Sequence, residues 1–370
     1  MTVATALVSG NDPLPQLAEE AVHQALARAR LTHANGVLLF LTPEFARHAQ
    51  PVITAVARAA QCTQVAGGIA SGVFTESGWV VDRPAAAVMV LGGGLSLGHP
   101  EAGDQPVLSY AGGRPPPDWS ISGTRFGGSF AGHVGFPDAV VWQQSRLAEP
   151  PCCAVQVLGA SVEVGVSSGL QLLGEPVRVE HSTAYDLERL GGQTALKSLS
   201  RTLPPELHQN TAQQLHHLSA VLLESDIKAA DALATGRYRP IAIIAANADQ
   251  SLTLSENVAP GQFLAWAIRQ PLTAEADMRL MIARLAASAA HPACALMFSC
   301  IGRGPYFYGG EDRDRDALCT RFPGLPVLGT YGTGQIAPTG AHGLNRQLQN
   351  AVVTALVSKH PEEADVQSIT

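Results

Sequence analysis

The sequence predicts an α/β protein with two related halves, mixed sheets and a β-meander, with a ligand cleft between the halves. The main observation is a glycine element that occurs twice, as Val65–Gly72 and as Val327–Gly334. Aligned without a gap, both copies begin with Val, and Gly67 and Gly72 of the first match Gly329 and Gly334 of the second. Each copy follows an apolar run and a helix-like segment, so strand, helix, strand and glycine turn recur roughly 260 residues apart. Two such turns that face each other across a domain boundary would frame a ligand pocket.

Bulk composition restricts the class of protein. The chain has 370 residues, of which 46% are hydrophobic and 15% charged, as in a well-packed globular protein with room for two domains. A net charge of -7 without long basic runs argues against a nucleic-acid partner. Met1–Gly10 does not resemble a signal peptide, and the longest apolar stretch, Ala85–Leu91, is too short to span a bilayer. These features predict a cytoplasmic protein that has no membrane partner.

The N-terminal segments predict a first strand–helix–strand unit. Leu14–Arg30 carries apolar residues at helical spacing, and Val37–Leu41 has the pattern of a buried strand. Thr42 provides a hydroxyl cap for a helix that begins with Pro and an acidic residue and runs to about residue 60. Gln61–Ala66 predicts the next strand, which ends at the first glycine element.

The central segments have a different pattern. Short β-rich runs separated by Gly, Pro and Ser predict the meander. These runs are Ala85–Leu91, Ala139–Gln143, Cys152–Leu158 and Val162–Val166. Glu101–Gly135, rich in Gly and Pro, predicts a long surface loop or lid, and Lys197–Ala234 predicts helix.

The C-terminal segments predict a second strand–helix–strand unit. Strands are expected at Ile241–Ala246 and twice within Ser251–Ile268, and a helix at Thr273–Ala290. The second strand–helix–strand unit is expected to comprise a strand at Cys294–Cys300, a helix at Asp312–Arg321 and a strand at Pro326–Tyr331. We place the division between the halves between residues 169 and 239.

The turn Ser299–Gly304 is the first candidate binding element, since open sheets place their ligands at strand ends. Arg303 lies between Gly302 and Gly304, where it is free to present a planar guanidinium to a carboxylate or phosphate. The competing interpretation is an ordinary turn with a solvated arginine.

Cysteine and histidine provide weaker candidates. None of the six cysteines forms a C-x-x-C pair, so the sequence predicts no zinc finger or thioredoxin motif. Cys300 would be a nucleophile if Arg303 lowered its pKa and His133 or His342 approached as a base, but a structural role is favoured. His133, which nearby Gly132 and Gly135 leave accessible, is the best-presented candidate for haem, although a lone histidine is more often a surface or core residue. We therefore predict no catalytic residues and no metal site.

Two long stretches resemble the FIST-domain family. The N-terminal stretch is Gly67–Val73 followed by Trp79–Val81 and the strand at Ala85–Leu91, and the C-terminal stretch comprises Leu296–Gly304 and Phe322–Pro338. Gly169–Leu203 is similar to the family's linker strand and helix. The resemblance implies a FIST N-type domain at 31–200, a FIST C-type domain at 201–345, and a C-terminal helix and tail at 346–370.

The resemblance also implies a function. FIST-domain proteins are sensory, so the chain is expected to be an intracellular bacterial protein that binds a small polar ligand, an amino acid or small carboxylate, and signals to a downstream protein. No cofactor is expected; the alternatives are a haem-dependent nitric oxide sensor and an enzyme that uses Cys300. One departure is Gln335, where the family usually has Glu. The expected ligand-binding residues are Gly67, Gly68, Ser71, Gly72, Cys300, Gly302, Arg303, Gly304, Tyr331, Thr333, Gly334 and Gln335.

Overall fold

The chain folds into two compact units. The computed structural model describes residues 2–101, 103–130, 139–204, 215–223, 228, 232–233, 237–289, 291–339 and 343–360. Unit 1 comprises Met1–Ser167, Met278–Pro338 and Asn345–Thr370, and unit 2 comprises Ser168–Asp277 and Thr339–Leu344. Unit 2 thus interrupts unit 1 in the sequence, whereas the predicted division was into two consecutive halves.

The N-terminal half of unit 1 contains the first predicted strand–helix–strand unit. Its elements are β1 (Val3–Ser9), α1 (Pro15–Ala29), β2 (Gly36–Leu41), the 3-10 helix η1 (Pro43–His48), α2 (Ala49–Ala60), β3 (Val65–Ile69), β4 (Gly72–Thr75), β5 (Gly78–Val81) and β6 (Ala85–Leu91). The Thr42 hydroxyl does not cap the helix as predicted, because it accepts a hydrogen bond from the backbone N–H of Ala85 at 2.9 Å. Strand β3 begins at Val65 and contains Gly67 and Gly68 of the first element rather than ending before them.

The C-terminal half of unit 1 contains the second unit. Its elements are β13 (Ala160–Ser167), α5 (Pro271–Ser288), β22 (Cys294–Cys300), the 3-10 helices η5 (Ile301–Arg303) and η6 (Pro305–Tyr308), α6 (Arg313–Arg321), β23 (Val327–Gly332), β24 (Gly334–Thr339), β25 (Leu344–Leu348) and β26 (Val352–Lys359). The predicted C-terminal helix is wrong for Val352–Lys359, which form a strand whose first six residues are buried. Residues 361–370 lie outside the described part.

The two halves repeat one topology, which confirms the predicted internal repeat. One sheet has the order β1-β6-β2-β3-β10-β11, and the other has the order β13-β26-β22-β23-β4-β5. In each, the first two strand pairs are antiparallel and the third pair, β2–β3 or β22–β23, is parallel. The order β1-α1-β2-α2-β3 thus corresponds to β13-α5-β22-α6-β23, with most of unit 2 inserted between β13 and α5.

The strand register reproduces the gapless alignment of the glycine elements. Gly67 lies opposite Leu39 in the β2–β3 pair, and Gly329 lies opposite Met297 in the β22–β23 pair. Leu39 and Met297 occupy the same position in the two apolar runs. The likeness between the halves therefore extends to individual backbone positions.

A third sheet replaces the predicted meander. It has the order β25-β24-β9-β8-β12-β7, with β7 (Ser96–Gly98), β8 (Val107–Ala111), β9 (Arg125–Ser129) and β12 (Cys152–Leu158). The short strands β10 (Val141–Gln143) and β11 (Arg146–Leu147) belong to the first sheet. The four segments predicted as a meander therefore join three different sheets. The predicted loop at 101–135 is also wrong where it forms the buried strands β8 and β9, with the 3-10 helix η2 (Pro117–Ser120) between them.

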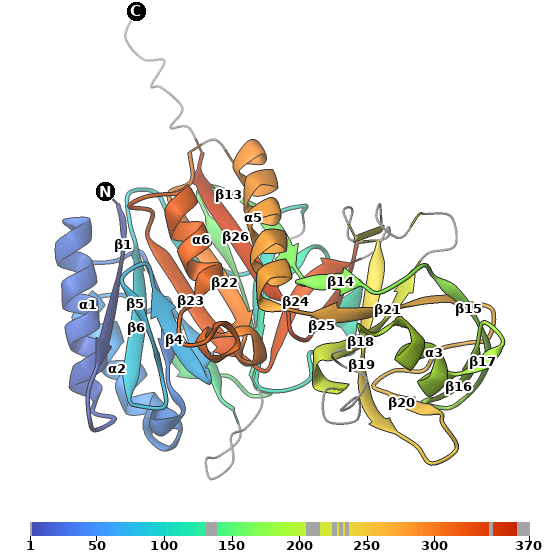
Figure 1. Ribbon diagram of the computed structural model, residues 1–370. Coiled ribbons are helices and arrows are strands. Elements are labelled where there is room, and N and C mark those ends of the chain that lie inside the picture. Colours follow the sequence, from blue (N-terminus) through green and yellow to red (C-terminus); the bar gives the residue numbers. More distant parts are fainter. Residues whose placement is uncertain are drawn as a thin grey trace, which may run out of the picture. The chain divides into compact units, whose positions relative to one another are not determined.

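Helices cover one face of each sheet of the repeat (Figure 1). Apolar residues of α1 and α2 pack with Leu39 and Val88 on the first sheet, and those of α5 and α6 pack with Met297 and Val327 on the second. The opposite faces of both sheets contribute to one large core, which also includes Tyr110 of the third sheet. Among the described residues, no helix has the length and hydropathy required to cross a membrane.

Unit 2 is a closed antiparallel barrel. Its elements are β14 (Leu170–Leu172), β15 (Val177–Thr183), β16 (Asp186–Leu190), β17 (Gln193–Thr194), α3 (Ala195–Thr202), η4 (Leu215–His217), β18 (Leu218–Leu223), β19 (Tyr238–Ala246), β20 (Leu252–Leu254) and β21 (Phe263–Arg269). The path β21-β15-β16-β20-β19-β18 closes because β18 pairs with β21. Closure leaves no free edge among these strands. Among the described residues of the helix predicted at 197–234, the prediction is confirmed within α3 and is wrong at Leu218–Leu223, which form β18 in the barrel core.

Candidate functional site

Three of the predicted binding elements converge on Tyr331. The backbone N–H of Ser71 donates to the Tyr331 carbonyl at 2.8 Å, and Gly72 is the register partner of Tyr331. A Cβ atom added to Gly304 would lie 3.2 Å from the Tyr331 ring. The two glycine elements therefore contact each other through their backbones inside unit 1, whereas the sequence predicted that they would face each other across a cleft.

The glycines of these elements allow close packing. A Cβ atom at Gly67 would lie 1.7 Å from the Leu39 carbonyl oxygen, and one at Gly334 would lie 2.6 Å from the amide of Gln347. Gly68 is equally buried, and an added Cβ would lie 3.0 Å from the Phe130 ring. These contacts explain why glycine is required without any ligand.

Arg303 is buried rather than presented to a ligand. Its side chain is 0% exposed, and its Nε and Nη2 donate to the two carboxylate oxygens of Asp314 at 2.9 and 3.0 Å. Nη1 donates to the Ser167 carbonyl at 2.9 Å, and Nη2 also donates to the Ser167 hydroxyl at 2.8 Å. Tyr308 donates to Asp314 at 2.9 Å. The prediction of an exposed anion-binding guanidinium at Arg303 is therefore not met in this structure.

Cys300 has the structural environment that the sequence favoured. It is 5% exposed, and its Sγ lies 3.7 Å from Oδ1 of Asn350. An added Cβ at Gly302 would also approach Asn350, at 3.0 Å, so this turn is tightly packed. Both histidines considered as bases, His133 and His342, lie outside the described residues. Within the described ranges, no group of three His, Cys, Asp or Glu side chains is placed to hold a metal ion.

Tyr331 and Asp312 form a second buried polar pair. The Tyr331 hydroxyl donates to Oδ2 of Asp312, and Oδ1 of Asp312 accepts from the backbone N–H of Arg315 as the N-cap of α6. Burial raises the pKa of Asp312 to about 6, although the Tyr331 hydrogen bond opposes this. Tyr331 thus bonds to Asp312 rather than to a ligand.

The raised pKa of Asp312 predicts a pH-dependent stability. The folded state holds this proton up to about pH 6, whereas an unfolded aspartate loses it near pH 4. Between these values the folded state binds more protons, so its contribution to stability falls as pH rises, by at most about 1.4 kcal/mol per pH unit. We expect urea unfolding from pH 4 to pH 7 to show this decline in the parent relative to Asp312→Asn. A pH-independent difference between the two proteins would contradict the assignment.

Thr333 and Gln335, the remaining predicted binding residues with polar side chains, differ in their hydrogen bonding. The Thr333 backbone N–H and hydroxyl donate to the Ser129 carbonyl at 3.1 and 3.2 Å. Gln335 is 0% exposed, and among the described residues neither its Oε1 nor its Nε2 has a hydrogen-bond partner. Gln335 is therefore the one member of the predicted set whose buried side chain has hydrogen-bonding capacity left within the described structure.

A polar crevice that the sequence did not predict lies at the carboxyl end of β2. Its volume is about 720 Å³, and its lining residues are Gly10, Asn11, Pro13, Glu44, Arg47, His48, Asp82, Arg83 and Pro84. Oε2 of half-buried Glu44 has no described hydrogen-bond partner. Neither Arg47 nor Arg83 forms an ion pair within the described ranges. The sequence feature that could have predicted this crevice is the carboxyl end of the β2 strand, because open sheets bind ligands at such strand ends.

The internal repeat explains why a crevice occurs here. It is bordered by the end of β1, the segment after β2 and the segment before β6. Equivalent backbone bonds close the two halves at this level, from Thr42 to Ala85 and from Cys300 to Ala351. In the C-terminal half, the end of β13 provides Ser167 and the turn after β22 provides Arg303, which donates to Ser167 and to Asp314 of α6. At this level the C-terminal half thus contains a buried ion pair, and the N-terminal half contains an open crevice lined by charged groups.

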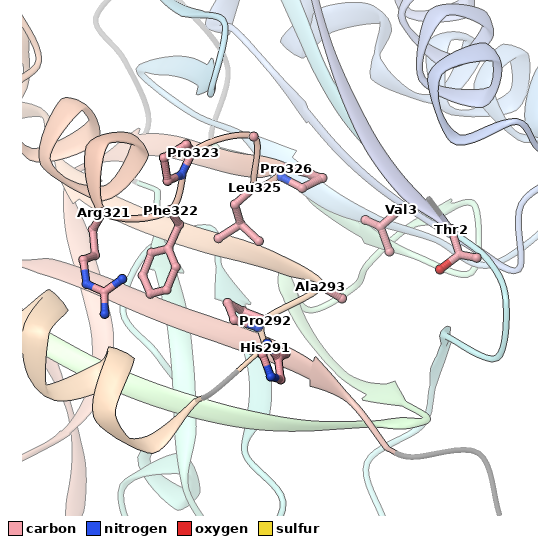
Figure 2. A pocket seen from close by; sticks show the side chains of 11 residues that line it. Thr2, Val3, His291, Pro292, Ala293, Arg321, Phe322, Pro323, Leu325 and Pro326 are labelled. Carbon is pink, nitrogen blue, oxygen red and sulfur yellow. The ribbon is translucent and has the colours of Figure 1, made fainter. Parts of the chain in front are cut away.

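A second cavity, of about 520 Å³, lies beside the amino ends of β22 and β23. Figure 2 shows Pro323, Leu325 and Pro326 on one side of it and His291 and Pro292 on another. Its polar lining side chains, Thr2, His291 and Arg321, include no carboxylate, and it lies at the strand ends opposite to those that bind ligands in open sheets. It is the weaker candidate for a polar ligand.

Comparison with known proteins identifies part of the chain. Residues 195–338 match the model of the FIST C domain. An uncharacterized protein of Mycobacterium tuberculosis strain H37Rv is 25% identical over 224 residues, which cover 59% of this chain and 57% of the relative. An uncharacterized protein of Mycobacterium bovis is 25% identical over 225 residues, which cover 60% and 58%. The match spans less than two thirds of the length of each of these relatives.

The family match agrees with the motifs of the second glycine element. It includes β22, the turn at residues 301–304 and β23 to residue 338. FIST C domains are sensory domains, which supports a role in signal transduction. The part of the chain that matches a known family is therefore residues 195–338, which are similar to the FIST C domain.

Proposed function

We propose that this chain is a sensory protein that binds a small dipolar molecule, an amino acid or small carboxylate, in the crevice at the carboxyl end of β2. The observation that supports this most is the pairing state of the crevice residues. Glu44 has a buried carboxylate oxygen without a described partner, and Arg47 and Arg83 form no ion pair among the described residues. A molecule with an ammonium and a carboxylate group would satisfy both kinds of charge.

The charges of the crevice favour a dipolar ligand over a simple ion. Glu44 and Asp82 provide negative charge, and Arg47 and Arg83 provide positive charge. A pure cation would be repelled by the arginines, and a pure anion by the carboxylates. The volume of about 720 Å³ lies in the range of small-molecule sites.

A contact at the rim provides a route for the signal. The Tyr306 hydroxyl, from η6 in the C-terminal half of unit 1, donates to Oδ2 of Asp82 at 2.7 Å. A ligand whose ammonium group engages Asp82 would compete with this hydrogen bond. Because Tyr306 is 63% exposed, its movement would change the surface that a downstream protein contacts.

The other functional classes have less support. A catalytic Cys300 would need a base, and its described polar neighbour is the Asn350 amide oxygen. A haem sensor would depend on His133, which lies outside the described residues. We therefore propose a binding protein without a cofactor.

Charge removal in the crevice tests this function. We expect Glu44→Gln and Arg83→Ala each to weaken the best amino acid or carboxylate ligand by about 1.5–3 kcal/mol, the range for hydrogen bonds to charged groups. The stability of the unliganded protein should change little, because Glu44 is only half-buried and Arg83 is exposed. Thermal-shift screening of amino acids, succinate and acetate, followed by calorimetric titration, measures both quantities.

Glu163→Gln is the matched control, since this carboxylate is exposed on β13. It should leave every ligand's affinity unchanged. If Glu44→Gln and Arg83→Ala bind the ligand as tightly as the control does, the crevice is not the site.

A further inference from the structure

The loop before β22 differs from its counterpart in the first half of the repeat. Because Leu39 of β2 corresponds to Met297 of β22, the loop residue Ala34 corresponds to Pro292. The backbone N–H of Ala34 donates to the carbonyl of Ala60, the last residue of α2, at 3.0 Å. This bond ties the loop before β2 to the end of the helix. Pro292 has no backbone N–H and cannot donate the corresponding bond.

The cavity of about 520 Å³ lies where this bond is missing. Strand β3 aligns with β23 in the same way, so Ala60 corresponds to Phe322, and both Phe322 and Pro292 line the cavity. The Phe322 carbonyl accepts instead from the backbone N–H of Leu325, at 3.2 Å. The neighbouring loop bonds occur in both halves, from Asn35 to Leu91 and Val37 to Gln64 in the first and from Ala293 to Val357 and Ala295 to Pro326 in the second. The difference between the halves is therefore local to the loop and the helix end.

Arg321 and His291 line this cavity without an acidic group among the described lining residues. The Arg321 guanidinium lies 5.1 Å from the centroid of the Phe322 ring, which holds the charge beside an apolar surface. Arg321 forms no ion pair within the described ranges. The imidazole of His291 can donate an N–H in every protonation state below that of its anion. The cavity therefore offers donors and positive charge for an anionic group.

Apolar side chains provide the surface between these polar groups. Figure 2 shows Phe322 beside Arg321 on one side of the cavity and Val3 beside Thr2 on the other. Leu325 and three prolines complete this surface. The volume lies within the range of small-molecule sites, so an apolar body of several carbon atoms has room here.

We infer that unit 1 contains a second binding site at the amino ends of β22 and β23, for a small monocarboxylate with an apolar body. The carboxylate would accept hydrogen bonds from Arg321 and His291, and the apolar body would pack on Phe322 and Leu325. An ammonium group would find no acidic partner in this lining. The site is therefore distinct in chemistry from the crevice at β2, whose charges suit a dipolar molecule.

The probes for this site are 3-phenylpropionate, its uncharged amide 3-phenylpropionamide, and acetate, which has the charge without the apolar body. We expect calorimetric titration of the full-length chain to show binding of 3-phenylpropionate, and binding of the amide and of acetate at least about tenfold weaker. Arg321→Gln should weaken 3-phenylpropionate about tenfold and leave the weaker binding of the amide unchanged. Phe322→Ala should weaken both the acid and the amide.

Arg58→Gln is the matched control, because Arg58 is exposed in the last turn of α2 and lines neither cavity. It makes the same change in net charge and should bind 3-phenylpropionate as the parent does. Each variant should keep the circular dichroism spectrum of the parent. If Arg83→Ala weakens 3-phenylpropionate as much as Arg321→Gln does, the probe occupies the crevice and this inference is overturned. It is equally overturned if 3-phenylpropionate does not bind, or if it binds Arg321→Gln as tightly as Arg58→Gln.

Discussion

Arg303→Ala is expected to destabilise the folded protein by about 3–5 kcal/mol, the cost of leaving one partner of a buried ion pair uncompensated. Arg303 and Asp314 are both 0% exposed, and three guanidinium nitrogens are bonded within the interior. The variant would leave the Asp314 carboxylate buried without its guanidinium partner, although the Tyr308 hydroxyl still donates to it. Urea denaturation followed by circular dichroism measures the loss.

Two further variants test whether the loss of stability comes from the buried ion pair. Arg189→Ala removes a 3.8 Å ion pair with Glu180 in which the side chains are 48% and 38% exposed, so it should cost no more than about 1 kcal/mol. The double variant Arg303→Met with Asp314→Leu removes both charges and should recover much of the loss. An Arg303→Ala protein as stable as Arg189→Ala would show that the guanidinium is solvated after all.

Gly67→Ala is expected to cost about 4 kcal/mol or more, which is exceptional for a single methyl group. The added Cβ would lie 1.7 Å from the Leu39 carbonyl oxygen, in the central parallel pair β2–β3, and the backbone φ of 154° is disfavoured for other residues. Since the clash is with backbone, a side-chain rotation cannot relieve it. Relief would require β2 and β3 to move apart.

Gly103→Ala is the matched control, because this glycine is exposed and an added Cβ would contact nothing within 4 Å. It should change the thermal midpoint little. A Gly67→Ala protein with the same midpoint as Gly103→Ala would contradict the register of β2 and β3, and with it the repeat alignment.

Local patterns were sufficient to predict the repeat. The apolar runs, the helical spacing of Leu14–Arg30 and the glycine elements all depend on nearby residues, and each agrees with an element of the structure. The meander prediction was wrong because strand partners are set by contacts far apart in the sequence. Strand β4, for example, pairs with β23, and β13 pairs with β26.

The site was predicted less well than the fold. An arginine between two glycines looks accessible in sequence, yet Arg303 is enclosed because Ser167 and Asp314 approach it from other segments. The open crevice depends on Glu44, Arg47 and Arg83, which have no motif in common. Gln335 was predicted as a binding residue, but its uncharged and interior setting comes from its partners in the third sheet.

Native mass spectrometry of the freshly purified chain and of Arg83→Ala tests the central proposal, a small dipolar ligand in the crevice at β2, most directly. We predict that the parent retains a small molecule, or takes up an added amino acid or carboxylate, whose mass identifies it. Arg83→Ala should retain at least about tenfold less of it, equivalent to about 1.4 kcal/mol. Equal retention by the two proteins, or no small molecule bound to either with any amino acid or carboxylate added, would contradict the account.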